Sequence, residues 1–255
     1  MTPLLIQEYK ALTMSKQSEV LEERREFLIR ALQAGVYALA GGLLLPRAAH
    51  AGALGKVPRE LPAGQSIYDL RGEVLVNGKP ATMNTVIGHS DRIETAKDGQ
   101  LIFVVGKDAF LMRGGSKLEL SGDDSLLVSG LRLVSGALLS VFGKKQHHFS
   151  TATATIGIRG TGLYVEAQED LSYVCTCYGT TDIAALNDPA SRETIVSQHH
   201  DAPRYILADG TSGQRIRRAP FKNHTDLELA LIEALVGRTP PFNLFDEGYG
   251  SPRRY

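Results

Sequence analysis

Cys175 and Cys177 are the only cysteines of this 255-residue chain, and one residue separates them. If they lie in a β-strand, both sulfurs project from the same face, because side chains alternate along a strand. His199, His200 and His224 follow further along the chain. Thiolate and imidazole ligands suit a tetrahedral Zn²⁺ ion or a copper ion. The pattern therefore predicts a metal site made of the two cysteines and one or two of these histidines.

Two other interpretations of the cysteines stay open. A disulfide between Cys175 and Cys177 would be strained, because Cβ atoms on one face of a regular strand lie further apart than the about 4 Å that a disulfide prefers. An oxidising compartment would nevertheless favour pairing. In the third interpretation the cysteines are small buried residues and the histidines are ordinary surface residues. The C-x-C…H-H…H spacing is not an established zinc signature, so the metal interpretation rests on ligand chemistry.

The sequence gives little support for catalysis. It has no Gly-x-Ser-x-Gly, no phosphate-binding glycine loop and no His-Glu-x-x-His. Cys175 and a histidine could in principle form a nucleophile and base, but Cys177 would compete for the thiol in an oxidising compartment. We therefore expect a protein that is not an enzyme. The pair His147-His148 beside two lysines predicts a solvated loop.

Composition limits the classes of partner and of fold. The chain has 28 basic and 28 acidic residues and no block of like charge, which argues against nucleic acid as a partner. Tryptophan is absent while glycine reaches 26, a balance that favours short strands and many turns over a helical bundle. No segment after Ala51 is long and apolar enough to span a membrane.

The elements that must position the cysteines are predicted to be mostly strands. Short alternating runs recur at intervals of roughly 8–12 residues, and one of them ends at the hairpin signal Asn77-Gly78. This spacing predicts a mainly β fold, either an antiparallel β-sandwich or a solenoid-like stack of short strands. Thr225 and Glu228 form a capping box that begins one C-terminal α-helix, and Gly237 ends it.

The N-terminal segment predicts an export signal. Residues 28–45 are largely apolar, charged residues precede them, and small residues before Ala51 form a cleavage site. A membrane anchor is the alternative, because a span needs about 20 apolar residues. Arg30 and Gln33 interrupt the apolar run and favour cleavage. The expected organisation is a signal peptide (1–51), a linker (52–66), a β domain (67–187), C-terminal strands with the helix (188–238), and a tail (239–255).

A paired-arginine motif precedes the apolar run. Its residues are Arg24, Arg25, Phe27 and Leu28. The motif resembles the recognition sequence of the twin-arginine (Tat) pathway, although Glu23 and Ile29 depart from its usual pattern. The resemblance implies a periplasmic location and export in the folded state, often with a cofactor already loaded.

The β-rich segment resembles the FecR domain family at several separate points. The matching segments are 72–78, 90–95, 99–103, 131–138 and 156–165. The most specific is the last, Ile-Gly-Ile-Arg159-Gly160-Thr161-Gly-Leu-Tyr-Val, which is similar to the family's Val-Arg-Gly-Thr-x-Phe-x-Val. The resemblance covers about residues 68–185. For Arg159-Gly160 we expect a structural role, a strand bulge with an arginine that binds a carboxylate or carbonyls.

The family resemblance implies a periplasmic domain for sensing or binding. Its best-known members are membrane-anchored regulators whose cytoplasmic helical region binds a sigma factor. Here at most 23 residues precede the signal, too few for such a region, so no direct sigma-factor contact is expected. We expect a non-catalytic module with an envelope protein partner and a candidate zinc or copper site. The alternatives are a metal- or haem-handling protein on a FecR scaffold, and an interaction module without a ligand.

Overall fold

The structure, a computed structural model, describes residues 58–122 and 128–242. The predicted export motif, Arg24, Arg25, Phe27 and Leu28, lies outside the described residues, as does the last part of the predicted tail. Within the described part of the chain, no helix is long and apolar enough to cross a membrane.

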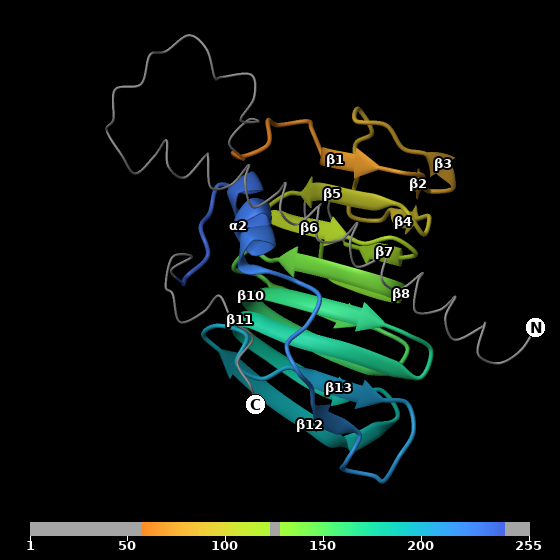
Figure 1. Ribbon diagram of the computed structural model, residues 1–255, viewed down its shortest axis with the longest axis vertical. Coiled ribbons are helices and arrows are strands. Elements are labelled where there is room, and N and C mark those ends of the chain that lie inside the picture. The colour runs from red at the N-terminus through yellow and green to blue at the C-terminus, as the bar shows by residue number, and fades with distance from the viewer. Residues whose placement is uncertain (1–57, 123–127, 243–255) are drawn as a thin grey trace, which may run out of the picture. The chain divides into compact units, whose positions relative to one another are not determined.

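The described residues contain fourteen strands and one helix, so the expectation of a mainly β fold with one C-terminal helix is confirmed (Figure 1). Their bounds are β1 Ile67–Arg71, β2 Val74–Val76, β3 Lys79–Pro80, β4 Arg92–Thr95, β5 Gln100–Val105, β6 Asp108–Met112, β7 Lys117–Ser121, β8 Gly130–Val141, β9 Gln146–Ser150, β10 Ala154–Ala167, β11 Leu171–Ala185, β12 Asp188–Ser197, β13 Arg204–Leu207, β14 Ile216–Arg218 and α2 Asp226–Leu235.

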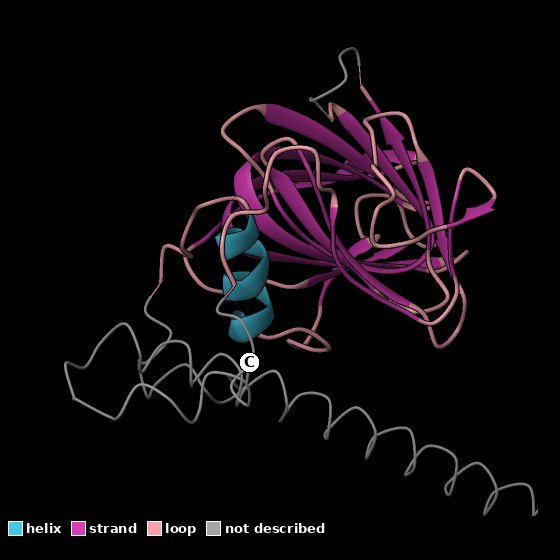
Figure 2. Ribbon diagram, turned by 90° about the horizontal axis from the view of Figure 1, so that it is seen from above, coloured by secondary structure: helices cyan, strands magenta, loops and turns pink. Residues whose placement is uncertain are grey.

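The strands hydrogen-bond into one continuous sheet that curves strongly (Figure 2). Its main path runs β14-β13-β11-β10-β9-β8-β7-β4-β2-β3, with β12 added at β11 and the series β6-β5-β1 added at β8. The pairings are antiparallel except that between β8 and β9. The long strands β8 and β10 change partners along their length. The first part of β10 pairs with β9, and its second part pairs with β8.

The change of partner on β10 falls at the predicted bulge. The register between β10 and β11 shifts between Arg159 and Gly162, and Gly160 has a φ of +55°. A positive φ is a conformation that glycine adopts without steric cost, which explains this residue at the bend. The Arg159 guanidinium forms an ion pair with the carboxylate of Asp182 on β11, on an exposed part of the surface.

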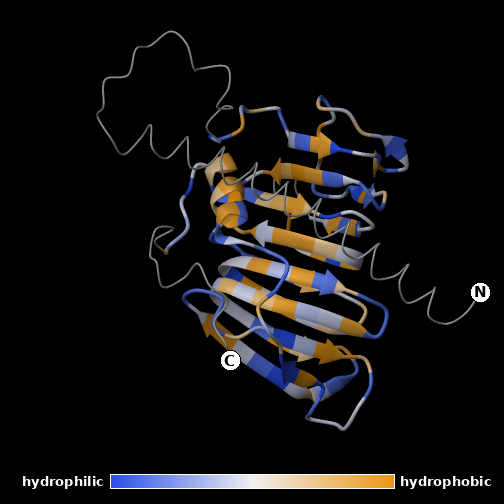
Figure 3. Ribbon diagram, in the orientation of Figure 1, coloured by the Kyte–Doolittle hydropathy of each residue, from blue (hydrophilic) through white to orange (hydrophobic). Residues whose placement is uncertain are grey.

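The half of the sheet around β5 and β6 is buried on both faces. On β5, Leu101, Phe103 and Val105 belong to the larger core, while Ile102 and Val104 point to the opposite face. A strand covered on both sides reads as a continuous apolar run, as this one does. Helix α2 covers the second face, and its apolar residues lie over the apolar strands (Figure 3).

The predicted capping box begins α2. The hydroxyl of Thr225 accepts a hydrogen bond from the Glu228 backbone N–H, and the Glu228 carboxylate accepts one from the Thr225 backbone N–H at 2.9 Å. Glu228 also binds Arg113 of the β6–β7 turn at 2.7 Å. The capping box and a partly buried ion pair to the sheet therefore both stabilise the N-terminus of α2.

Candidate metal centre

Both cysteines lie on the face of the sheet that α2 covers. Cys175 and Cys177 belong to strand β11 and pack in the cluster beneath the helix, whereas Val174 points into the larger core. The period of two along a strand therefore places both sulfurs on one face, as predicted. Neither cysteine has solvent-exposed surface, and neither forms a disulfide. A register shift against β10 makes Cys177 the extra residue of a bulge.

His200 reaches the cysteines from the turn that follows β12. Its backbone N–H donates to the carbonyl of Cys177 at 2.8 Å, which ties the turn to β11. Its φ is +53°, in the left-handed region that residues other than glycine seldom adopt. The ring of His200 points toward the cysteines, and its Nδ1 lies 3.4 Å from Cys175 Sγ.

His224 reaches the same point from the residue before the N-cap of α2. Its Nδ1 lies 2.7 Å from the carbonyl oxygen of Lys222, and its ring stacks on Tyr164 of β10 with centroids 4.3 Å apart. The other nitrogen, Nε2, lies 3.1 Å from Nδ1 of His200. The stacked ring and the carbonyl together fix which nitrogen of His224 faces the sulfurs.

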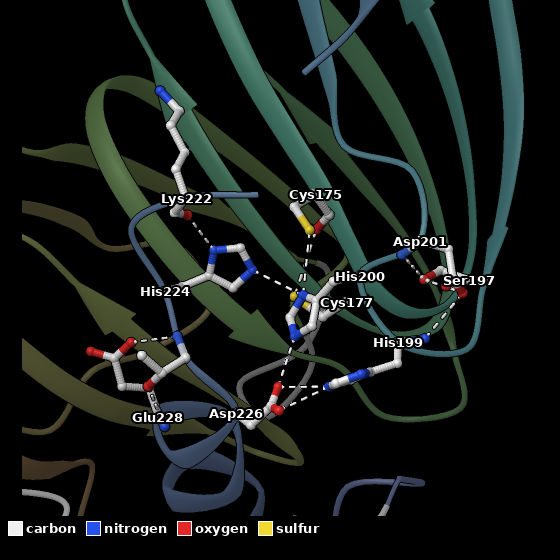
Figure 4. A network of polar contacts seen from close by, with 11 residues as sticks. Cys175, Cys177, Ser197, His199, His200, Asp201, Lys222, His224, Asp226 and Glu228 are labelled. Atoms are coloured by element: carbon white, nitrogen blue, oxygen red, sulfur yellow. Dashed lines mark hydrogen bonds and ion pairs between the residues drawn. The ribbon is translucent and has the colours of Figure 1, made fainter. Parts of the chain in front are cut away.

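Four ligand atoms thus converge from three segments of the chain (Figure 4). The sulfurs of Cys175 and Cys177 and one ring nitrogen each of His200 and His224 all lie within 4.8 Å of one another, and all four residues are buried. The predicted constellation is therefore brought together with two of its three histidines. The third, His199, belongs instead to a second group with His200 and Asp226, in which its Nε2 lies 2.9 Å from both carboxylate oxygens of Asp226.

Asp226 is a site residue that the sequence pattern did not predict. It is the first residue of α2, and its Oδ1 lies 2.9 Å from His200 Nε2. A carboxylate two residues after a histidine, at a helix N-terminus, is the sequence signal that could have identified it. A ligand histidine commonly donates its second N–H to a carboxylate or a backbone carbonyl. Both histidines have such an acceptor here, Asp226 for His200 and the Lys222 carbonyl for His224.

These acceptors determine where the lone pairs point. An acceptor beside His200 Nε2 and another beside His224 Nδ1 place the hydrogens on those atoms, so neutral rings present lone pairs at His200 Nδ1 and His224 Nε2. These two atoms are only 3.1 Å apart and face the thiols. Two lone pairs at that distance repel each other unless a cation, either a proton or a metal ion, lies between the ligands. The four buried residues could therefore hold a metal ion.

Electrostatics inside the site favour the same conclusion. Burial lowers the pKa of His200, but its hydrogen bonds to Asp226 and Cys175 outweigh burial and raise the pKa to about 9. Burial likewise raises the pKa of the Cys175 thiol, but the hydrogen bond from Cys177 and the nearby His224 and His200 rings lower it well below its usual value. The contacts between Cys175 and His200 therefore shift both pKa values in the direction that favours the charged form of each group. A metal ion would take the place of a proton between the ligands.

The order Cys175, His200, Asp226 also has the form of a nucleophile, a base and an acid that orients the base. A nucleophile must, however, meet its substrate. Cys175 is fully buried beneath α2, and Cys177 beside it is equally buried. The arrangement is thus better suited to holding an ion than to attacking a substrate.

One prediction about histidines is wrong. His147 does not belong to a solvated loop but lies on strand β9, where it is buried, and its Nε2 lies 3.0 Å from the carboxylate of Asp108. His148 does lie at the surface, because it occupies the opposite face of the same strand. The buried polar ring is accounted for by Asp108 and by the Lys145 carbonyl 3.0 Å from its Nδ1.

The protein shows only limited similarity to known proteins. No family model matches the chain, and no curated relative matches its sequence. Two crystal structures of a candidate anti-sigma factor from Parabacteroides distasonis align with it at 11% and 12% identity and TM-scores of 0.40 and 0.39. Each alignment covers 50% of this chain and 58% of the other, so the match spans little more than half of the length of that protein.

Proposed function

We propose that this protein is an exported, non-catalytic β domain of the cell envelope that binds one Zn²⁺ ion and serves as a binding or sensing module. The observation that carries the proposal is the convergence of Cys175, Cys177, His200 and His224 within 4.8 Å. Ideal zinc geometry requires ligand atoms roughly 3.3–3.8 Å apart, given typical Zn–N and Zn–S bond lengths. The two ring nitrogens, 3.1 Å apart, would separate slightly, and the more distant ligand atoms would move closer together, to complete the coordination sphere.

Charge balance favours zinc over copper. Two thiolates neutralise a divalent ion, whereas a monovalent copper ion would leave a net negative charge in a site whose ligands are all buried. Divalent copper has the same charge as zinc, but it prefers square-planar coordination to the tetrahedral coordination that suits zinc. Zn²⁺ also accepts tetrahedral Cys₂His₂ coordination without any redox chemistry. When bound, it would supply a fixed link between strand β11, the turn after β12 and the start of α2.

The envelope location and the sensing role rest on the sequence. The twin-arginine motif at Arg24-Arg25 supports export of a folded chain, which would allow zinc to be loaded before export. The resemblance of residues 68–185 to the FecR domain supports a periplasmic binding or sensing module with an envelope protein as partner. A metal would protect the two thiols from oxidation in that compartment.

Metal analysis tests the proposal directly. The mature chain, exported and processed by a bacterial host, would be recovered from the periplasm and analysed by elemental mass spectrometry. We expect about one zinc per chain, with metal lost from Cys177→Ser. The matched control is His148→Ala, which removes an exposed histidine and should retain the metal. Metal-free protein with a Cys175–Cys177 disulfide in intact-mass analysis would contradict the proposed function.

A further inference from the structure

Helix α2 begins at the metal centre. His224 immediately precedes the N-cap Thr225, and Asp226, the first residue of the helix, accepts the N–H of His200. A metal bound to His224 would therefore fix the start of the helix to strand β11, which carries the two cysteines. Thr225 alone separates His224 from the first residue of the helix, so a change in metal occupancy would act at the start of α2.

The other attachments of α2 are mostly side-chain contacts. Leu229, Ile232 and Leu235 pack on the sheet, and Glu233 at the other end of the helix contacts Tyr178 and Arg238. Within the described residues, one hydrogen bond joins the helix backbone to a distant segment, from the Leu61 N–H to the Leu235 carbonyl. Helix α2 has ten residues, and isolated helices shorter than about 12–15 residues are only marginally stable in water. The helix thus depends on its attachments.

The surface beneath α2 is itself shaped to hold a helix. Its apolar residues come from three neighbouring strands: Ile102, Val104, Ala109, Leu111, Leu139 and Val141. At the end near the helix N-terminus, Arg113 binds Glu228 at 2.7 Å. This surface therefore fits an amphipathic helix with apolar residues three or four positions apart and an acidic residue in its first turn.

We propose that the metal acts as a latch on α2, so that loss of the metal frees the helix and opens this surface to an amphipathic helix of an envelope partner. The inference rests on the proposed function, because it requires the metal centre. It goes beyond metal binding, because a bound metal does not by itself imply that the helix is released when the metal is lost. To replace α2, the partner helix must carry the same features: an apolar stripe along one face and an acidic residue in its first turn, like Glu228.

Hydrogen exchange tests the latch. Amide exchange would be followed by mass spectrometry in the zinc-loaded full chain and in the same chain after chelation, with metal content measured in both samples. We expect exchange in residues 226–235 to become at least about tenfold faster on chelation, while β5 and β6 keep their protection. Unchanged exchange in α2 would overturn the latch, as would loss of protection throughout β10 and β11, which would indicate global unfolding.

A peptide tests the opened surface. A labelled peptide with the sequence of residues 225–237 is expected to bind the chelated chain at least about tenfold more tightly than the zinc-loaded chain, by fluorescence anisotropy. The control peptide carries Ile232→Asp and should not bind. Equal binding to both forms, or none to the chelated form, would overturn the docking surface. A chain that binds no zinc in the first place contradicts the proposed function, whereas a zinc-binding chain that fails these tests contradicts only the latch.

Discussion

Nδ1 of His200 lies 3.1 Å from Nε2 of His224, although the two residues are 24 positions apart in the chain. Each ring directs its other nitrogen to an acceptor, so the facing nitrogens carry lone pairs when the rings are neutral. This relationship, together with the two sulfurs, gives the centre four ligand atoms that could hold a metal ion. It also identifies the residues that hold the rings in place, and these can be tested separately from the ligands.

Asp226→Asn should weaken metal binding without removing a ligand. The amide oxygen can still accept the N–H of His200, but the negative charge that increases the basicity of the ring is lost. Changes of this kind usually reduce metal affinity by about 10–100-fold. Competition with a chromophoric zinc chelator would measure the effect. The control is Asp209→Asn, which alters an exposed carboxylate outside the centre and should leave the affinity unchanged. Equal affinities for the two variants would contradict the orienting role of Asp226.

Tyr164→Leu should loosen His224, whereas Tyr164→Phe should not. The Tyr164 ring stacks on the His224 ring with an interplanar angle of 20°, and its hydroxyl donates to Glu166 at 2.9 Å. Phenylalanine keeps the stack, and Lys222 and Asn223 still bind Glu166 in its place. Loss of a ring pair costs about 1 kcal/mol beyond the lost buried area.

Zinc affinity and the midpoint of thermal unfolding should therefore both fall in the Tyr164→Leu variant and remain near their original values in Tyr164→Phe. If the phenylalanine variant loses affinity as severely as the leucine variant, the hydroxyl group and not the stack positions His224.

The local patterns of the sequence predicted much of the centre, because they depend on neighbouring residues. The period of two along a strand placed Cys175 and Cys177 on one face, and the capping box at Thr225 located the start of α2. The choice of His200 over His199 was not predictable in this way. It depends on the positive φ of His200 and its backbone bond to Cys177, both of which follow from tertiary structure.

The burial of His147 was missed for a similar reason. Its partner Asp108 is 39 residues earlier in the chain. Strand β6 pairs with the last residues of β8, which places Asp108 beside the connection from β8 to β9, where it accepts the Gly143 N–H at 2.8 Å. When only residues adjacent in the sequence are considered, two histidines beside lysines indicate a polar loop. The alternation on β9, with His147 inside and His148 outside, is visible only once the strand is known.

Gly162→Ala should destabilise the fold, while Gly157→Ala on the same strand should be nearly neutral. A Cβ at Gly162 would lie 2.5 Å from Cε1 of Tyr178, a largely buried ring held by its hydroxyl contact to Glu233 of α2. A Cβ at Gly157 would lie 3.6 Å from its nearest neighbour, an ordinary contact. Overpacking of this kind costs about 1–3 kcal/mol.

Chemical denaturation of both variants would measure this difference in the free energy of unfolding. Equal stability of the two variants would show that the Tyr178 ring moves aside without cost, and that close packing does not require glycine at position 162.

Asp188→Asn should change how the stability of the fold depends on pH in the acid range. Hydrogen bonds from the Ser191 and Ser212 hydroxyls and the Gly213 N–H lower the pKa of Asp188 to about 2. The folded-state pKa is therefore below the unfolded value of about 3.9. The carboxylate contributes stability that is fully present above the unfolded pKa and is lost as pH falls through about 2.

We expect the denaturation midpoint of the original chain to fall steeply between about pH 4 and pH 2. The midpoint of Asp188→Asn should be lower at neutral pH and should fall less over the same interval. Parallel profiles for the two chains would mean that these hydrogen bonds do not favour the ionised form of Asp188.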